Sequence, residues 1–230
     1  MSRKHQSSTR PKQKRILLVD DHPLMRRGQA DLLNREEDFA VCGEAGTARE
    51  AMEAIAKLKP DLVLADMALP DKDGLELIKD IQALYPGLPV LAMSMQDESL
   101  YAARVLRAGG RGYVMKAEGL ERLAPAIRTV LNGQVALSPR MSAKVLESMV
   151  GHSGKVGSGP EAKLSDRELG VLHLFGEGWS TEEIATRLHL SPKTVDVHRA
   201  HIKEKLELKT TPEFQRFAIR WVASQGGPTK

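Results

Sequence analysis

The first half of the chain alternates short apolar runs with longer segments of helical spacing. The apolar runs lie at residues 16–19, 39–45, 62–65, 89–94 and 112–116, and each has the length of a buried strand. The segments between and after them place apolar residues three or four positions apart and mostly end at Gly or Pro. These helical segments span residues 22–34, 47–58, 75–84, 98–108 and 120–131. Five strand–helix units in succession predict an α/β domain built on one doubly wound parallel sheet.

The last part of the chain carries helical signals alone. Ser165 and Ser180 are each followed three residues later by Glu, the pattern of a capping box, and Ser191 is followed by Pro192 at the favoured first helical position. Helices are expected after each of these serines, the third over 192–208, and a last one from Thr211 through Trp221. Two helices joined by a short turn predict a small all-α domain of helix-turn-helix type.

These patterns divide the chain into four segments. Residues 1–14 are expected to be a disordered basic tail, 15–132 the α/β domain, 133–160 a linker and 161–227 the all-α domain. The linker opens with Ser138-Pro139, a helix start, and its residues 151–160 are rich in Gly and Ser. We therefore expect a linker helix followed by a flexible tether.

Composition fits a soluble protein with packed cores. Hydrophobic residues make up 41% of the chain, and no apolar run approaches the length of a membrane span or forms a signal peptide, so we expect a cytoplasmic location. The net charge of +4 comes from residues 1–15, which hold six Lys or Arg and no acid. Residues 161–230 hold eleven basic and ten acidic side chains, so charge alone does not distinguish a DNA-binding domain from a protein-binding one.

Polar side chains stand at the carboxyl ends of the predicted strands. Asp20 and Asp21 end the first strand, Asp66 the third, Ser94 the fourth and Lys116 the fifth. In a flavodoxin-like strand order the first and third strands are neighbours, and ligands bind at that edge of the sheet. Clustered carboxylates repel one another, which a divalent cation offsets, and an all-oxygen site favours Mg²⁺. Taken singly, Asp66 and Ser94 could be strand-end caps and Lys116 a surface lysine, but their joint placement indicates a metal and phosphate site.

This constellation resembles the receiver domain of two-component response regulators over about residues 15–132. The resemblance rests on Asp20-Asp21, Asp66 with Pro70 and Gly74, Ser94, and Gly112-Tyr-Val-Met-Lys116. It implies that Asp66 accepts a phosphoryl group from a sensor histidine kinase. It further implies a Mg²⁺ ion held by Asp20, Asp21, Asp66 and the backbone carbonyl of Ala68. The phosphoryl oxygens would then bind Lys116 and Ser94, and Tyr113 would be an aromatic switch that turns inward when Ser94 moves.

Two further positions bear on the lifetime of the phosphoryl group. Ala68, two residues after Asp66, has no polar side chain that could orient a hydrolytic water, whereas Gln96, two residues after Ser94, has one. We expect slow self-dephosphorylation and no other enzymatic activity.

The all-α domain resembles the LuxR-type helix-turn-helix of NarL/FixJ response regulators over about residues 163–227. The resemblance rests on Leu164-Ser-x-Arg-Glu168, Glu183-Ile-Ala185, Leu190-Ser-x-x-Thr-Val195 and Val197-His198 through Lys205-Leu206. Helix 192–208 would enter the major groove of double-stranded DNA. The expected DNA-contacting residues are Ser191, Lys193, Thr194, Asp196, Val197, Ala200, His201 and Lys203.

These residues divide by the part of DNA that they suit. The side chains at the start of the helix suit phosphates, and Val197 suits a thymine methyl group. Asp196 stands where some subfamilies have a basic residue, which lowers the expected phosphate affinity but leaves cytosine as a hydrogen-bond donor to it.

The sequence thus predicts a response regulator that acts as a transcription factor. Phosphorylation of Asp66 would release the DNA-binding domain and promote a homodimer on paired half-sites, with RNA polymerase as a further candidate partner and no membrane. Three alternatives remain. The first is a phosphorylation-independent regulator with a silent receiver. The second is an Asp-nucleophile phosphatase resembling the haloacid dehalogenase family, which needs a second Asp where Ala68 stands. The third is a helical module that binds protein.

Overall fold

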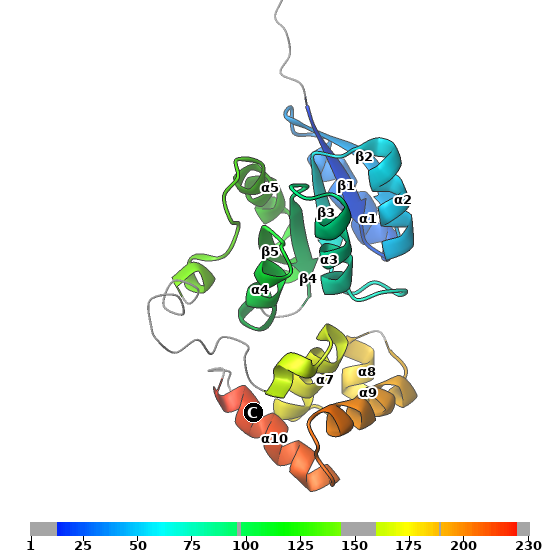
Figure 1. The fold of residues 1–230 in the computed structure, drawn as a ribbon, viewed down its shortest axis with the longest axis vertical. Coiled ribbons are helices and arrows are strands. Elements are labelled where there is room, and N and C mark those ends of the chain that lie inside the picture. Colours follow the sequence, from blue (N-terminus) through cyan, green and yellow to red (C-terminus); the bar gives the residue numbers. More distant parts are fainter. Residues whose placement is uncertain (1–12, 96–97, 144–159, 189, 225–230) are drawn as a thin grey trace, which may run out of the picture.

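The structure is a computed structural model that describes residues 13–95, 98–143, 160–188 and 190–224. An α/β domain is followed by a small helical domain, which faces the carboxyl-terminal edge of the sheet (Figure 1). Most of the expected tail and the expected tether lie outside the described residues. None of the described helices has the length and hydropathy that a membrane span requires.

The sheet has the predicted parallel, doubly wound arrangement. Its strands are β1 (Lys14–Val19), β2 (Phe39–Ala45), β3 (Leu62–Asp66), β4 (Val90–Ser94) and β5 (Gly112–Met115), in the order β2-β1-β3-β4-β5. In the register of β1 and β3, Val19 lies opposite Ala65, so the residues that follow them, Asp20 and Asp66, meet at the same edge. Strand order and register therefore bring together carboxylates that are 46 positions apart.

Five helices cover the two faces of this sheet. They are α1 (Pro23–Leu33), α2 (Ala48–Leu58), α3 (Gly74–Leu84), α4 (Glu98–Arg107) and α5 (Leu123–Leu131). Leu17 and Val19 of β1 belong to the core under α2, α3 and α4, whereas Ile16 and Leu18 belong to the core under α1 and α5. This alternation follows from the period of two along a strand.

The fifth helix starts later than the sequence predicts. Two 3-10 turns, Lys116–Glu118 and Leu120–Arg122, precede α5 and replace the first turn of the expected helix 120–131. Gly119 separates them with a φ of +90°, a conformation that interrupts helical geometry. Lys116 consequently lies in a tight turn directly after β5.

The helical domain contains α7 (Asp166–Gly176), α8 (Thr181–Arg187), α9 (Pro192–Lys205) and α10 (Thr211–Ser224). Ser165 and Ser180 form complete capping boxes with Glu168 and Glu183, and the Ser191 hydroxyl accepts the Thr194 N–H. The third helix ends at Lys205 rather than at 208, because Glu207 has a φ of +56°. The buried core of the helical domain is formed by Leu169, Leu172, Phe175, Ile184, Val195, Ile202, Phe214, Ala218 and Val222.

The first part of the linker packs on the α/β domain. Ala136 forms a parallel bridge with Gly112 of β5, and residues 139–143 are helical. The Ser138 hydroxyl accepts the Met141 N–H and so caps this turn, as the Ser138-Pro139 pair predicts. Val145, Leu146 and Met149 of the expected linker helix lie outside the described residues.

Gly74 is required by the close passage of the loop that follows β3. A Cβ atom at this position would lie 2.5 Å from the Met67 Cα and 2.9 Å from the Asp66 carbonyl oxygen. We expect Gly74→Ala to lower the free energy of unfolding by about 1–3 kcal/mol in urea titrations followed by far-UV circular dichroism, because backbone atoms cannot move aside freely. Gly46→Ala is the control, since its Cβ would approach no atom closer than 3.5 Å, the Glu50 Oε2. Equal destabilisation of both variants would contradict the prediction.

Candidate functional site

Three carboxylates gather at the carboxyl-terminal edge of the sheet. Asp20 follows β1 and is fully buried, Asp66 ends β3 and is 2% exposed, and the Asp21 side chain is 29% exposed. Together with His22, one ligand atom from each of these residues lies within 4.8 Å of the others. Asp66 is the last residue of the strand rather than part of the loop, so it is less open to solvent than its strand-tip position leads one to expect.

Lys116 connects two of these carboxylates. Its Nζ donates to Asp20 Oδ2 at 2.7 Å and to Asp66 Oδ2 at 2.8 Å, and its side chain is only 4% exposed. Burial raises the pKa of Asp66, although the charge and hydrogen bond of Lys116 oppose that change. Burial alone would lower the pKa of Lys116, but the attraction of Asp66 and Asp20 outweighs it and the pKa is raised. The lysine therefore keeps its charge between the two acids.

The donor set fits a divalent cation. Three carboxylates face a single ammonium group, so the cluster carries excess negative charge that a 2+ ion would neutralise. Asp66 Oδ1 also accepts the Ala68 N–H at 3.2 Å, and Ala68 pairs with Asp73 across the β3–α3 loop. The residues that could hold a metal ion are Asp20, Asp21, Asp66 and His22, whose imidazole lies beside Asp21.

Ser94 and Tyr113 lie on the strands next to Asp66. Ser94 is the last residue of β4, is 3% exposed, and stands opposite Met115 of β5. Tyr113 of β5 is also 3% exposed and lines a cavity beneath the linker. Asp66, Ser94 and Lys116 thus occupy the ends of three successive strands, β3, β4 and β5. Gln96 lies outside the described residues.

The structure adds residues that the sequence did not single out. Gln29, on the inner face of α1 and 1% exposed, donates from Nε2 to Asp20 Oδ2 at 3.3 Å. The Arg26 guanidinium donates to the Asp20 carbonyl, and His22 Nδ1 lies 2.7 Å from Asp21 Oδ1. The signal in the sequence was a polar Gln among the apolar residues of a core-facing helix.

Asp71 anchors the loop between β3 and α3. Its two carboxylate oxygens accept the N–H groups of Ala48 and Arg49, at 2.9 and 3.1 Å, in the first turn of α2. An acidic side chain is favourable there, because the N-terminal end of a helix carries positive partial charge. The anchor holds the loop that contains Ala68 and was also missing from the sequence interpretation.

The face of α9 that the sequence assigned to DNA is exposed. Lys193, Asp196, Val197, Ala200 and His201 all point to solvent, with Val197 45% exposed, whereas Val195 and Ile202 are buried. Ser191 is also exposed, and Thr194 and Lys203 are half-buried. One face of α9 is therefore buried in the domain, and the other, with the residues that follow its cap, is open to a partner.

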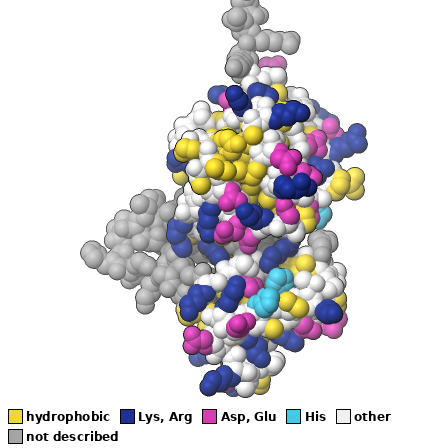
Figure 2. All heavy atoms as spheres, turned by 45° about the vertical axis from the view of Figure 1, so that its right-hand side comes forward, with side chains coloured by type: hydrophobic (Ala, Val, Ile, Leu, Met, Phe, Trp, Pro, Cys, Tyr) yellow, Lys and Arg dark blue, Asp and Glu magenta, His cyan; other side chains and the backbone are white. Residues whose placement is uncertain are grey.

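Two ion pairs change the roles expected around α9. Arg199 donates to Asp196 Oδ1 at 2.8 Å, so a guanidinium group lies beside the acid that stood in place of a basic residue. Lys205, which could have flanked DNA phosphates, instead binds Glu168 Oε2 at 2.7 Å and ties α9 to α7. Figure 2 shows Lys and Arg mixed with Asp and Glu over the face in view, rather than a surface of one sign.

Glu168 is expected to make the stability of the helical domain depend on pH. Burial would raise its pKa, but the hydrogen bond from Lys205, the Ser165 N–H and the Lys205 charge outweigh burial and lower it from the ordinary value of 4.5. Because the folded-state pKa is depressed, this contribution is present above pH 4.5 and is lost as the pH falls through the lowered pKa. Glu168→Gln should lower the free energy of unfolding by about 1–3 kcal/mol at neutral pH, and should change it very little well below the lowered pKa of Glu168.

Tryptophan fluorescence in urea measures this effect in the full chain, because both tryptophans, Trp179 and Trp221, lie in the helical domain. Glu204→Gln, exposed near the C-terminal end of α9, is the control and should not lower the unfolding midpoint at either pH. A difference between Glu168→Gln and the unmodified protein that persists in acid would contradict the assignment.

Comparisons with known proteins agree with this geometry. Residues 16–128 match the response regulator receiver domain family, and residues 162–218 match the luxR family of bacterial regulatory proteins. The oxygen regulatory protein NreC of Staphylococcus carnosus is 33% identical over 210 residues, which cover 90% of this chain and 97% of NreC.

Solved structures of similar proteins include DNA complexes. RcsB of Salmonella enterica serovar Typhimurium, bound to promoter rprA in the presence of the phosphomimetic BeF₃⁻, is 25% identical with a TM-score of 0.56, covering 90% of this chain and 98% of that one. A structure of two RcsB dimers on two parallel DNAs is 25% identical with a TM-score of 0.54, covering 93% of this chain and 98% of that one. The similarity extends over nearly the whole length of these relatives and includes both matched domains of this chain. This chain therefore belongs to the response regulators that join a receiver domain to a LuxR-type DNA-binding domain and regulate transcription.

Proposed function

We propose that Asp66 is the residue that accepts the phosphoryl group, and that a sensor histidine kinase supplies it. The observation that carries this proposal is Lys116, whose ammonium group bridges Asp20 and Asp66 at the edge of the sheet. A buried lysine at hydrogen-bonding distance from a carboxylate can hold an oxygen of a phosphoryl group transferred to that carboxylate. Ser94, at the end of the adjacent strand, is the candidate for a second oxygen.

The transfer moves a phosphoryl group from nitrogen to oxygen. A carboxylate oxygen of Asp66 forms a bond to phosphorus while the bond between phosphorus and the imidazole nitrogen of the kinase breaks, and that nitrogen keeps the electron pair. The raised pKa of Asp66 accompanies greater basicity of this oxygen. Lys116 offsets the negative charge on the phosphoryl oxygens, which take no part in the bond that forms or the bond that breaks.

We propose that the cluster takes Mg²⁺, with Asp20, Asp21, Asp66 and the Ala68 carbonyl as its protein ligands. When bound, the ion supplies positive charge against the phosphoryl oxygens. Oxygen ligands and a phosphate partner are what Mg²⁺ prefers. Gln29 and Arg26 hold Asp20 in place, and Asp71 holds the loop that carries Ala68.

The output is sequence-specific binding to double-stranded DNA through α9, as a homodimer on paired half-sites. The dimers in the RcsB complex with DNA support this part of the proposal. The exposed face of α9 already points to solvent here, so phosphorylation is proposed to act on domain placement and dimerisation rather than by uncovering that face. RNA polymerase is the proposed further partner and the cytoplasm the proposed location.

We propose that the protein is a phosphoryl acceptor and not an enzyme, apart from slow self-dephosphorylation. Ala68 offers only a methyl group two residues after Asp66, where the rival phosphatase would need a carboxylic acid. The match to the luxR family of bacterial regulatory proteins, and the RcsB complex with DNA, favour DNA over a purely protein-binding module.

Asp66→Asn tests the assignment of the acceptor. Acetyl phosphate with Mg²⁺ should add one phosphoryl group to the unmodified protein and none to Asp66→Asn, as measured by intact-protein mass spectrometry. Binding to a DNA selected from a random pool should tighten at least several-fold on phosphorylation in the unmodified protein only. Asp31→Asn, an exposed acid of α1, is the control that should behave as the unmodified protein does.

Each rival function has its own outcome in this test. Equal DNA binding by Asp66→Asn and by the phosphorylated protein would favour a regulator with a silent receiver. Steady turnover of phosphate esters would favour the phosphatase. Recovery of no DNA motif would favour a protein-binding module.

The expected contacts to DNA phosphates and to DNA bases differ in how much they make the binding constant depend on salt concentration. Lys193→Ala should weaken binding to all sequences and reduce the slope of log K against log salt by about 1, because a phosphate contact is lost. Val197→Ala should leave that slope unchanged and lower affinity for the selected sequence by about 1 kcal/mol, roughly fivefold in Kd. Fluorescence anisotropy across a salt series measures both effects, and a change of slope in Val197→Ala would contradict its role at a base.

A further inference from the structure

Helix α4 holds the start of the linker. Glu98, its first residue, is buried, and its carboxylate accepts the Ser138 N–H at 2.8 Å. Ser138 in turn caps the turn at 139–143 through its hydroxyl. The first residue of α4 is therefore bonded to the residue that begins the linker helix, 40 positions later in the chain.

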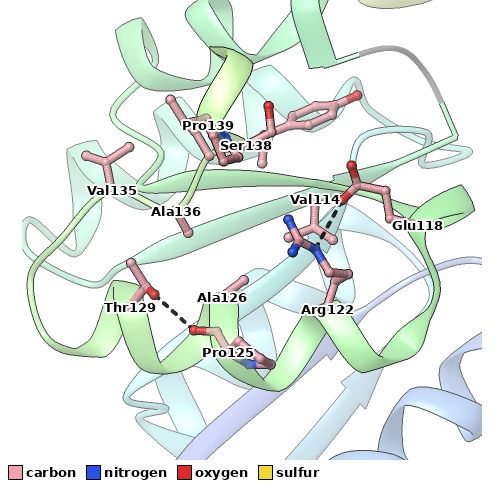
Figure 3. Close-up of a pocket in the computed structure, with 12 residues that line it drawn as sticks. Val114, Glu118, Arg122, Pro125, Ala126, Thr129, Val135, Ala136, Ser138 and Pro139 are labelled. Atoms are coloured by element: carbon pink, nitrogen blue, oxygen red, sulfur yellow. Dashed lines mark hydrogen bonds and ion pairs between the residues drawn. The ribbon is translucent and has the colours of Figure 1, made fainter. Parts of the chain in front are cut away.

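The segment just before Ser138 lies along the edge strand of the sheet. Tyr113 N–H donates to the Ala136 carbonyl at 2.9 Å, and Ala136 N–H donates to the Arg111 carbonyl at 3.0 Å. Between this segment and α5 lies a cavity of about 290 Å³ (Figure 3). Val135, Ala136, Ser138 and Pro139 stand on one side of it and Ala126 and Thr129 on the other. The segment is thus fixed to β5 and α4, whereas the cavity separates it from α5.

The same helix also contacts the DNA-binding domain just beyond the end of the linker. Arg104, two turns along α4 from Glu98, donates from Nη2 to the Leu164 carbonyl at 2.5 Å. Leu164 is 1% exposed and directly precedes Ser165, the cap of α7. This hydrogen bond crosses from the receiver domain to the first turn of the DNA-binding domain.

We propose that α4 is a two-point clamp across the linker: Glu98 holds Ser138 near the start of the linker, and Arg104 holds Leu164 just beyond its end. The clamp fixes where the DNA-binding domain sits in the unphosphorylated protein. Because the DNA face of α9 is exposed, the clamp acts by restricting the placement of two such domains on paired half-sites. This inference rests on the proposed function and adds the residues through which the receiver controls its output.

The position of α4 explains how the acceptor site can open the clamp. Ser94 ends β4, and only residues 95–97 separate it from Glu98. In this proposal, movement of Ser94 toward a phosphoryl group on Asp66 displaces the start of α4, whose first residue is four positions further along the chain. Tyr113, whose N–H donates to the Ala136 carbonyl, lies on β5, the strand next to the one that Ser94 ends.

Clamp variants in the full chain test the inference. Glu98→Ala, Arg104→Ala and the double variant remove the two grips, while Glu98→Gln and Arg104→Lys keep a polar group at each position. Arg49→Ala, an exposed residue of α2, is the control. Unphosphorylated double variant should bind the selected DNA as tightly as the BeF₃⁻-treated unmodified protein does. The ratio of Kd values without and with BeF₃⁻ should fall from about tenfold to about one.

Phosphoryl incorporation and thermal unfolding accompany these measurements. Incorporation from acetyl phosphate should stay unchanged, since neither residue belongs to the acceptor site. If the alanine variants unfold at lower temperature, Glu98→Gln and Arg104→Lys carry the test, with a smaller fall in the ratio expected. Unchanged ratios in the variants, with the unmodified protein still responding to BeF₃⁻, would overturn the clamp and leave the proposed function standing.

A distance measurement tests the clamp without phosphorylation. Spin labels on cysteines at residues 53 and 220, both exposed, report the separation of the two domains by pulsed electron paramagnetic resonance in a Cys42→Ser background. The unmodified protein should give a narrow distribution and the double variant a broad one. A narrow distribution in the double variant would overturn the clamp, whereas a BeF₃⁻-insensitive Kd in the unmodified protein would instead count against the proposed function.

Discussion

The ammonium group of Lys116 between Asp20 and Asp66 is the interaction on which the receiver domain depends. The side chains of Asp20, Asp66 and Lys116 are almost completely buried there. Burying a charge is strongly unfavourable unless the charge is paired with an opposite one. The pairing is possible only because β1, β3 and β5 end at the same edge and a tight turn directs Lys116 back over the sheet. Sheet register, the glycine that admits the β3–α3 loop and the turn after β5 all serve this one arrangement.

The same arrangement limits which parts of the receiver domain adjoin Asp66 and can respond to a chemical change there. The acids and the lysine adjoin the ends of β4 and β5, where Ser94 and the turn of Lys116 lie. Ser94 leads directly into α4, and Tyr113 is bonded to the linker segment through its backbone. One helix and one edge strand, α4 and β5, therefore lie between the acidic cluster and the contacts with the linker and the DNA-binding domain.

The helical domain solves a similar problem on a smaller scale. Glu168 completes the cap of α7 and binds Lys205 near the end of α9, so one buried carboxylate fixes the angle at which the DNA-facing helix is held. Because Lys205 is paired with Glu168, its positive charge is less available to DNA phosphates. In a domain with nearly balanced charge, the proposed DNA interface rests on specific positions of α9 rather than on net charge.

The sequence by itself determined the order of strands and helices, the caps at Ser165, Ser180 and Ser191, and the strand-end positions of Asp20, Asp66, Ser94 and Lys116. These are local properties, because hydrophobic period, capping and turn residues act over a few positions. Only the tertiary structure decided which distant groups meet. The contacts of Gln29 with Asp20, Asp71 with α2, Lys205 with Glu168, Glu98 with Ser138 and Arg104 with Leu164 join residues from nine to 60 positions apart. Such partners are chosen by register and packing, and a polar side chain alone gives no sign of which one it will find.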